Sequence, residues 1–227
     1  CTERFHFETE DAEPKLVVYG VITNEYKRQM IRLTSSAPFF YPQLSSLVSN
    51  ATVQIYGSNK KIYELQEDPS LPGYYISKNY WQAHIGITYF LDIQVDFNND
   101  GVVEKYEAST TLQEAIDLDS IKVPPITIMG HNNYALNIYG QDTPTEDYYL
   151  FHVTANDTIV TNVISKYIIA DDELFNGQYI NGLTIHYFDH VSEWEKDSEE
   201  DRKRSVYLKP GDLITVYSSK IEKGYFD

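Results

Sequence analysis

The segment VDFNNDGVVEKYE carries oxygen-bearing side chains at the spacing of a calcium-binding loop. Asp96, Asn98, Asp100, Gly101 and Glu107 fit the pattern D-x-[DN]-x-[DN]-G-x5-E without a gap. Carboxylate and amide oxygens are the ligands that calcium prefers, and the glycine allows the sharp turn between them. The spacing therefore indicates a candidate site for a structural calcium ion, with Asp96, Asn98 and Asp100 as its ligands.

The flanks of this segment favour a hairpin turn instead. An EF-hand needs a helix on each side of its loop, whereas the preceding ITYFLDIQV alternates with period 2 and is rich in β-branched and aromatic residues. The following KYEASTTL is also typical of a strand. We interpret residues 98–101 mainly as a turn in which Gly101 takes a positive φ. Glu107 then lies too far along the second strand to complete a site, and calcium remains the alternative.

Aromatic side chains in expected loops form a second candidate site. Phe39, Phe40 and Tyr41 lie between two prolines, and Tyr80 and Trp81 lie in a second loop. Exposed aromatic residues on a rigid β scaffold are good anchors for a sugar, a peptide or a protein partner. The alternative is that these rings cap the ends of the fold.

The segment DDELFNGQYI is the most distinctive internal stretch. Asp171, Asp172 and Glu173 could present an acidic patch to a receptor or to a cation. The structural interpretation, which we favour, places the Asn-Gly pair at 176–177 in a turn and inserts the Leu-Phe pair at 174–175 into the core.

Nucleophilic and nucleotide chemistry find little support. The sequence has one cysteine, no G-x-S-x-G elbow, no P-loop and no G-x-G-x-x-G. His186 and His190 are four residues apart, but on a strand this spacing separates the side chains by about 13 Å, too far for one zinc ion. Among 34 acidic residues some carboxylate pairs arise by chance, so a hydrolase with paired carboxylates is kept as the catalytic alternative.

The composition predicts a folded, mostly β protein. Hydrophobic residues make up 42% of the 227 residues, and tyrosine, which fits pleated surfaces, occurs 20 times. The formal net charge of −16 would repel a phosphate backbone, so we expect no nucleic-acid partner.

The pattern of short strands and turns predicts an all-β fold with two β-sandwich domains. Residues 1–14 are polar and acidic and are expected to form a tether. The strands of residues 15–112 predict an immunoglobulin- or transthyretin-like sandwich. Residues 113–125 end in a Pro-Pro pair and are interpreted as a linker, and residues 126–227 are expected to form the second sandwich. Only residues 191–204 have helical composition, and as a charge run they are expected to be a solvated loop and not a site.

Cys1 is the single cysteine and stands at the first position. This is the residue that carries the lipid after cleavage of a lipoprotein signal peptide, so we expect lipidation of Cys1. The sequence has no apolar run near the roughly 18 to 20 residues that span a bilayer. A lipid on Cys1 would therefore anchor the protein to a membrane without threading it.

Several segments occur in the order of a known family. The most specific are DDELFNGQYI and the opening LVVYGVITNE, accompanied by LTSSAPFF, ATVQIYG, PGYY, YEASTTL, IDLDSI and KPGDLITV. With these segments the chain resembles a family of Bacteroidota outer-membrane lipoproteins of unknown function, often encoded beside TonB-dependent receptors of the starch-utilisation type. The resemblance covers almost the whole chain. It implies an N-terminal lipidated cysteine, outer-membrane anchoring and two β domains, and it implies no catalytic residues.

We therefore expect an outer-membrane, lipid-anchored protein on the extracellular face that acts as a non-catalytic accessory or binding subunit of a TonB-dependent nutrient uptake complex. Its partners would be the receptor, the membrane through the lipid on Cys1, and a glycan or peptide ligand. No cofactor is expected beyond a structural calcium ion. The alternatives are a surface glycan- or peptide-acting hydrolase with paired carboxylates, and a structural, adhesin-like surface protein.

Overall fold

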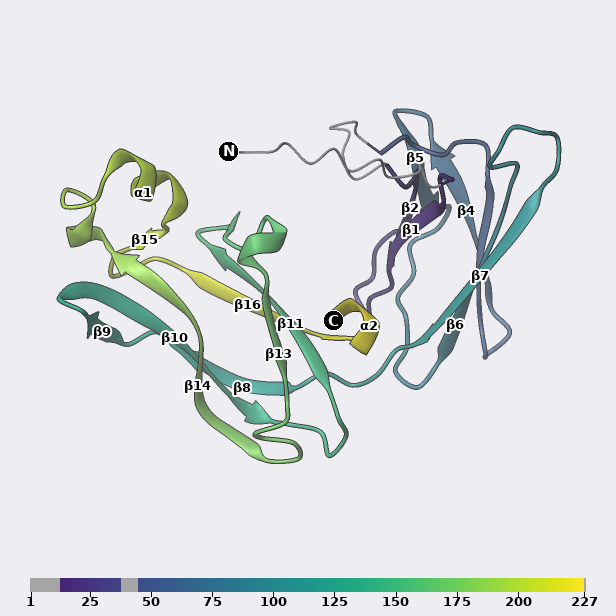
Figure 1. The fold of residues 1–227 in the computed structure, drawn as a ribbon. Helices are drawn as coiled ribbons and strands as arrows, with labels where there is room; N and C mark the ends of the chain where they lie inside the picture. Colours follow the sequence, from purple (N-terminus) through teal and green to yellow (C-terminus); the bar gives the residue numbers. More distant parts are fainter. Residues whose placement is uncertain (1–12, 38–44, 227) are drawn as a thin grey trace, which may run out of the picture. The chain divides into compact units, whose positions relative to one another are not determined.

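The computed structural model describes residues 13–37 and 45–226. The chain divides after Gln113 into two compact units, which we call unit 1 and unit 2 (Figure 1). The fold is all-β, as predicted, with 52% of residues in strands and 8% in helices.

Unit 1 is built on one curled, antiparallel, seven-stranded sheet with the order β1-β2-β5-β4-β3-β6-β7. The strands are β1 Leu16–Val21, β2 Met30–Ser35, β3 Thr52–Gly57, β4 Ile62–Asp68, β5 Leu71–Ser77, β6 Thr88–Val95 and β7 Glu104–Thr111. Strand β4 pairs with β3 on one side and with β5 on the other, so it joins the two halves of the sheet.

Alternating apolar side chains explain the curl of this sheet. Ile31 and Leu33 on β2 and Val53 and Ile55 on β3 are all at most 3% exposed and belong to one buried cluster. Successive side chains of a strand point to opposite faces, so each strand presents one apolar face. The two halves of the sheet must curl around these faces to remove them from water.

Unit 2 contains two sheets. The first has five strands: β15-β14-β10-β8 in order, with β9 also paired to β10. Its strands are β8 Asp117–Lys122, β9 Pro125–Ile128, β10 His131–Gln141, β14 Tyr179–His190 and β15 Tyr207–Leu208. The second sheet is centred on β11 Tyr148–Ala155, which pairs with β12 Thr158–Ile159, β13 Ile168–Asp171 and β16 Ile214–Ile221. Between and after these strands lie four short helices of the described residues: η1 Ile164–Lys166, η2 Val191–Glu193, α1 Glu199–Arg204 and α2 Lys223–Phe226.

The core of unit 2 lies between these two sheets. Leu136 and Ile138 on β10 are fully buried, as are Tyr149, Phe151 and Val153 on β11. These side chains belong to two clusters that each combine residues of both sheets. The packing holds the ends of β10, β11 and β13 together, and this arrangement positions one of the sites described below.

The segment expected as a linker, residues 113–125, is instead partly a strand. β8 lies within it and pairs with β10 over five positions, from Asn137 opposite Lys122 to Gln141 opposite Asp117. Leu118 and Ile121 of β8 pack against the apolar clusters of unit 2. Burial of these two side chains stabilises β8 in the sheet, which the acidic composition of the segment did not predict.

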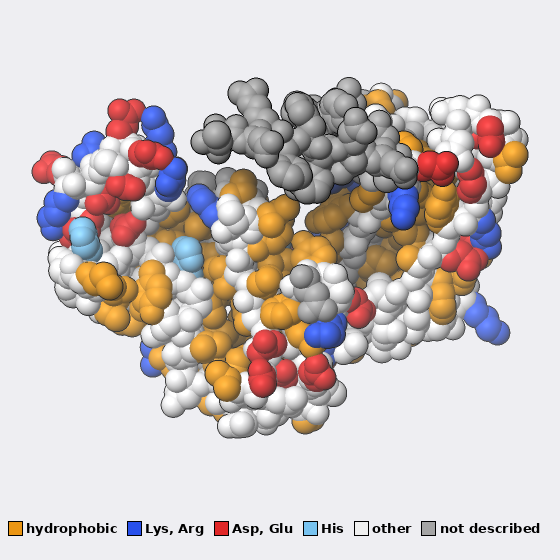
Figure 2. Space-filling view, viewed as in Figure 1, with side chains coloured by type: hydrophobic (Ala, Val, Ile, Leu, Met, Phe, Trp, Pro, Cys, Tyr) orange, Lys and Arg blue, Asp and Glu red, His pale blue; other side chains and the backbone are white. Residues whose placement is uncertain are grey.

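The charge run at residues 191–204 forms η2 and α1. Charged side chains of both signs gather over α1 (Figure 2). Lys203 pairs with Glu199 at 2.9 Å and Arg204 with Glu200, each four residues apart. These exposed ion pairs support a short solvated helix and contribute little to the stability of the whole protein.

Candidate functional site

The calcium-like segment forms a tight connection between β6 and β7. The carboxylate of Asp96 accepts hydrogen bonds from the backbone N–H groups of Asp100 and Gly101, both at 3.0 Å. Asn99 and Gly101 have positive φ values of 56° and 87°. Glu107 lies within β7, and its carboxylate pairs with Lys105. The turn is therefore closed by its own side chains, and calcium binding by Asp96, Asn98 and Asp100 stays a prediction.

Trp81 requires a correction, because it is not an exposed anchor. It is only 7% exposed, and its ring stacks on that of Tyr63 with 3.7 Å between the centroids. Its backbone forms an antiparallel bridge with Lys27, with N–H···O distances of 3.2 and 3.0 Å. Burial of most of this large ring makes it a support of the loop that carries Tyr80 and excludes it as an exposed anchor.

Tyr80 lies on the surface of unit 1 beside two residues of the β1–β2 connection. Tyr80 is 57% exposed and Tyr26 is 70% exposed, and their ring centroids are 6.0 Å apart. The guanidinium carbon of Arg28 lies 5.5 Å from the centroid of the Tyr80 ring, a cation–π contact. We call Tyr26, Arg28 and Tyr80 the tyrosine platform. Tyr80 was predicted from the sequence, whereas Tyr26 and Arg28 were not, because only the pairing of the two loops brings them beside Tyr80.

A buried glutamine fixes the two loops of the platform. Gln29 is 1% exposed, and its backbone N–H donates to Ser77 Oγ at 3.0 Å. Its side-chain amide donates to the carbonyl oxygens of Thr23 and Trp81 at 3.3 Å each, and its Oε1 accepts from the N–H of Thr23. One side chain thus ties together the β1–β2 loop and the β5–β6 loop, so the exposed rings are held in place before any partner binds.

A cavity of about 340 Å³ is lined in part by the loop that carries Tyr80, although none of the three platform residues belongs to its lining. Asn79 and Trp81, which flank Tyr80 in the sequence, are part of its wall, together with an ion pair between Lys78 and Glu64 at 2.6 Å. This lining combines ring surface with charged and amide groups, which suits a polar ligand such as a sugar or a peptide.

The remaining predicted aromatic residues, Phe39, Phe40 and Tyr41, lie outside the described residues, as does Cys1. Among the helices that the structure describes, none has the length and apolar character needed to cross a membrane.

The DDELFNGQYI segment has the expected turn at residues 176–177, where Gly177 has a φ of 68°, but single residues differ from both interpretations. Asp171 and Glu173 are exposed, but Asp172 is 1% exposed and cannot belong to a surface patch. Leu174 was expected in the core and is 89% exposed, while Phe175 packs against the core of unit 2. The cause is a tight turn in which the N–H of Phe175 donates to the carbonyl of Asp172 at 2.8 Å. The turn directs only one of the two apolar side chains inward.

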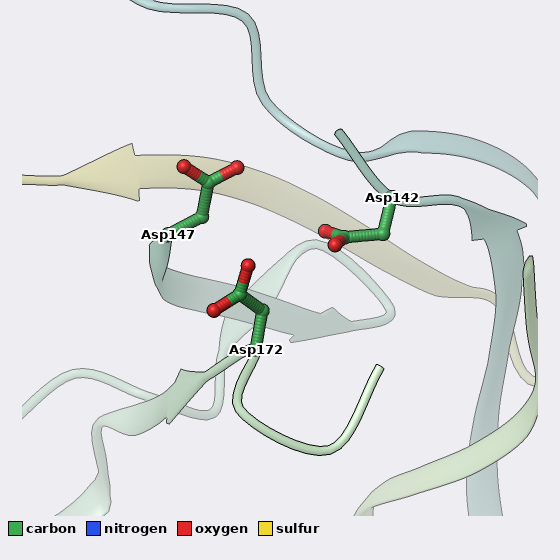
Figure 3. A group of neighbouring side chains, drawn as sticks. All are labelled: Asp142, Asp147 and Asp172. Carbon is green, nitrogen blue, oxygen red and sulfur yellow. The ribbon is translucent and has the colours of Figure 1, made fainter. Parts of the chain in front are cut away.

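Asp172 meets two other aspartates inside unit 2 (Figure 3). Asp142 directly follows β10, Asp147 directly precedes β11, and Asp172 directly follows β13. Their exposed fractions are 2%, 0% and 1%, and one carboxylate oxygen of each lies within 4.8 Å of the others. We call these three residues the aspartate cluster. Within the described residues, they form the group of acidic side chains whose spacing fits a metal ion.

Asp147 has the most partners in the cluster. Its Oδ1 accepts from Thr145 Oγ1 at 2.8 Å and pairs with the ammonium group of Lys220, a β16 residue. Its Oδ2 accepts from the hydroxyl groups of Thr143 and Tyr149. Burial raises the pKa of Asp147, but these partners, Lys220 above all, outweigh burial and leave the pKa lowered. Asp147 is therefore ionised.

Asp142 has two partners. Its Oδ1 accepts from the Tyr149 hydroxyl at 2.5 Å, and its Oδ2 accepts from the N–H of Gly177 at 2.9 Å. The Tyr149 hydroxyl also lies 2.9 Å from Asp147 Oδ2. Burial, together with the two carboxylates, raises the pKa of Tyr149, so this hydroxyl keeps its proton. The single hydroxyl proton of Tyr149 therefore lies between two acceptors, the carboxylates of Asp142 and Asp147.

Asp172 is the least compensated member. Its Oδ2 is buried and has no hydrogen-bond partner among the described residues. Burial raises the pKa of the Asp172 carboxyl, and the negative charges of Asp142 and Asp147 raise it further. The sequence indicated Asp172 as a candidate cation ligand but gave no signal for Asp142 and Asp147, because the three members come from separate segments and each is one acidic residue among 34.

The fold and these sites define an all-β protein with an exposed aromatic platform on one unit and an enclosed acidic cluster in the other. The chain belongs to the family described as a domain of unknown function, DUF4249, which matches residues 2–225. No curated protein and no solved structure matches the chain.

Proposed function

We propose that this protein is a non-catalytic binding subunit, anchored to the outer face of the outer membrane through a lipid on Cys1, that associates with a TonB-dependent receptor in nutrient uptake. Membership of a family without an assigned activity is compatible with this role. The chain resembles Bacteroidota lipoproteins that are often encoded beside such receptors, and this resemblance is the reason for proposing a TonB-dependent receptor as the partner.

The tyrosine platform is the observation that carries the binding role. Tyrosine and arginine are among the residues that dominate the energetics of protein interfaces. Here two tyrosine rings that are more than half exposed lie 6.0 Å apart, and an arginine contacts one of them, on loops fixed by Gln29 and the Lys27–Trp81 bridge. Pre-organisation lowers the entropy cost of binding. The neighbouring cavity offers a place for a glycan or peptide ligand.

The alternative of a hydrolase with paired carboxylates gains no support from the aspartate cluster. A catalytic pair must reach the scissile bond of its substrate. Asp142, Asp147 and Asp172 are at most 2% exposed, and one carboxylate oxygen of each lies within 4.8 Å of the others inside unit 2. We therefore assign these carboxylates no catalytic role.

Site-directed photo-crosslinking in native cells tests the proposal. A photo-reactive phenylalanine derivative replaces Tyr80, and after irradiation the crosslinked product is identified by mass spectrometry. We expect a crosslink to a TonB-dependent outer-membrane receptor, because the Tyr80 ring would lie in the contact surface.

The matched control carries the same derivative in place of Tyr187, a unit 2 tyrosine that is 51% exposed. This position has nearly the same exposure as Tyr80, so it measures the background of random encounters. Equal crosslinking from both positions, or no receptor at the Tyr80 position, would refute the platform as the receptor-binding surface.

A further inference from the structure

The aspartate cluster lacks positive charge. With all three carboxylates ionised, Asp142, Asp147 and Asp172 would bring three negative charges, and Lys220 contributes the one ion pair to the cluster within the described residues. Three negative charges and one positive charge leave a sum of −2. The Lys220 side chain is 10% exposed and that of Asp147 is fully buried, so water cannot screen this excess effectively.

The cluster also has too few hydrogen-bond donors. The single proton of the Tyr149 hydroxyl faces both Asp142 Oδ1 and Asp147 Oδ2. Asp172 Oδ2 has no donor at all among the described residues, although Asp172 is 1% exposed. Figure 3 shows the Asp172 carboxylate directed toward the other two carboxylates. A buried polar atom without a partner is costly, and its position here points to a positively charged ligand between the three side chains.

The separations fit the coordination sphere of calcium. One oxygen from each aspartate lies within 4.8 Å of the others. Calcium binds oxygen at about 2.3–2.6 Å, so two oxygens on opposite sides of the ion are about 4.6–5.2 Å apart. Magnesium is usually held by one or two carboxylates in a strict octahedron, whereas calcium takes about six to eight oxygen ligands in flexible geometry, so three carboxylates favour calcium. The hydroxyl oxygens of Thr143 and Thr145, which contact Asp147, are further oxygen ligands of the kind that calcium accepts.

We propose that Asp142, Asp147 and Asp172 bind one calcium ion inside unit 2. The ion balances the charge of −2 and gives Asp172 Oδ2 its missing partner. Donors that are all oxygen favour a hard cation over zinc or copper, which prefer nitrogen and sulfur ligands. This site is distinct from the turn at Asp96, Asn98 and Asp100 in unit 1.

The ion would act as a structural clamp. Asp142, Asp147 and Asp172 lie at the ends of β10, β11 and β13, which belong to two different sheets. Asp172 also begins the turn that presents Leu174, and Gly177 of the same turn donates to Asp142. Calcium would therefore fix this exposed turn as well as the sheet ends. The inference does not depend on the receptor-binding role.

Calcium titration of the purified protein tests the site. The protein is stripped with EDTA, and calcium alone is then added in a calorimeter and in thermal unfolding experiments. We expect one calcium ion per chain and a rise in the unfolding temperature of roughly 5 °C or more at saturating calcium. Magnesium at the same concentration is expected to produce a smaller rise.

Three substitutions locate the ion. Asp172→Asn keeps the shape of the side chain and is expected to abolish the calcium-induced rise. Its stability in EDTA should equal or exceed that of the wild type, because one repelling carboxylate is gone. Glu173→Gln makes the same charge change on the next, exposed residue and should leave the calcium response intact. Asp96→Asn, in the turn of unit 1, should also leave it intact.

Several results would overturn the inference. The absence of calcium binding to the wild type in the calorimeter would do so directly, whether or not any variant folds. If Asp96→Asn loses the calcium-induced rise in unfolding temperature and Asp172→Asn keeps it, the ion binds in the turn of unit 1. If Asp172→Asn stabilises the protein equally with and without calcium, and the wild type does not respond to the ion, a proton on Asp172 would be what reduces the negative charge of the cluster.

Discussion

Buried carboxylates in unit 2 differ in how their charge is balanced. Glu193 is 1% exposed, like Asp172, but it has full compensation. Lys196 Nζ lies 2.9 and 3.1 Å from its two oxygens, and Asn132 Nδ2 donates to it at 3.0 Å. His131 Nδ1 lies 3.3 Å from its Oε2. Asp172 Oδ2 has no such partners, and this contrast is what makes the aspartate cluster a candidate site.

Glu193 provides a prediction for the pH dependence of stability. The hydrogen bond from Lys196 is the main cause that lowers the pKa of Glu193 from 4.5 to about 2. A lowered pKa in the folded state gives stability that is complete above pH 4.5 and is lost as the pH falls toward 2. We therefore expect Glu193→Gln to be less stable than the wild type at neutral pH and to approach it at pH 2.

Urea unfolding at a series of pH values measures this difference. Glu195→Gln, two residues away at an exposed position, serves as the control for the loss of one carboxylate. A constant difference between Glu193→Gln and the wild type from pH 4.5 to pH 2 would contradict the prediction.

Single residues also show what local sequence leaves open. Tyr80 and Trp81 are neighbours of similar chemistry, yet Tyr80 is 57% exposed and Trp81 is 7% exposed. The same is true of Leu174, at 89%, and Phe175, which packs inward. A loop has no fixed period that assigns its side chains to an inner or an outer face. Such assignments depend on the bridges and turns that the tertiary structure creates.

Strands were predictable where their apolar residues alternate. The hairpin of β6 and β7 follows directly from the alternating pattern before and after the Asn-Asn-Asp-Gly turn. β8 was missed, because its acidic residues and the nearby prolines resemble a linker. The segment TIVTNVISKYIIA, residues 158–170, is rich in β-branched residues, which are typical of a strand, but it forms β12, η1 and the first part of β13. Such a composition gives no signal for where a short helix interrupts the strand.

The contact between β8 and β10 depends on a glycine. A Cβ atom on Gly140 would lie 2.3 Å from the carbonyl oxygen of Asp117 and 3.0 Å from Cα of Leu118. We expect Gly140→Ala to destabilise unit 2 by about 1–3 kcal/mol, because β8 must move away from β10.

Urea unfolding followed by circular dichroism checks this prediction. Gly224→Ala is the control, because Gly224 has no heavy atom within 4 Å of the added Cβ and lies in α2. Alanine is favoured over glycine in a helix, so this variant should be at least as stable as the wild type. Equal unfolding midpoints for the two variants would show that the sheet tolerates a side chain at residue 140.

The whole molecule combines two β units with different roles in our account. Unit 1 carries the tyrosine platform and its cavity, and unit 2 encloses the aspartate cluster. The sequence predicted the all-β class because composition and alternation act over the whole chain. It could not predict the aspartate cluster, because that site requires three strand ends to meet in space.

The central claim is that the protein binds a TonB-dependent receptor through the tyrosine platform. The most direct measurement is affinity purification of the lipidated protein from native membranes in mild detergent, with quantification of co-purified proteins by mass spectrometry. We expect the wild type and Tyr187→Ala to recover a receptor in stoichiometric amount. The double variant Tyr26→Ala/Tyr80→Ala should recover it about tenfold less, as expected when interface anchors are removed. Recovery of the wild type without a receptor, or equal recovery by the double variant, would contradict the account.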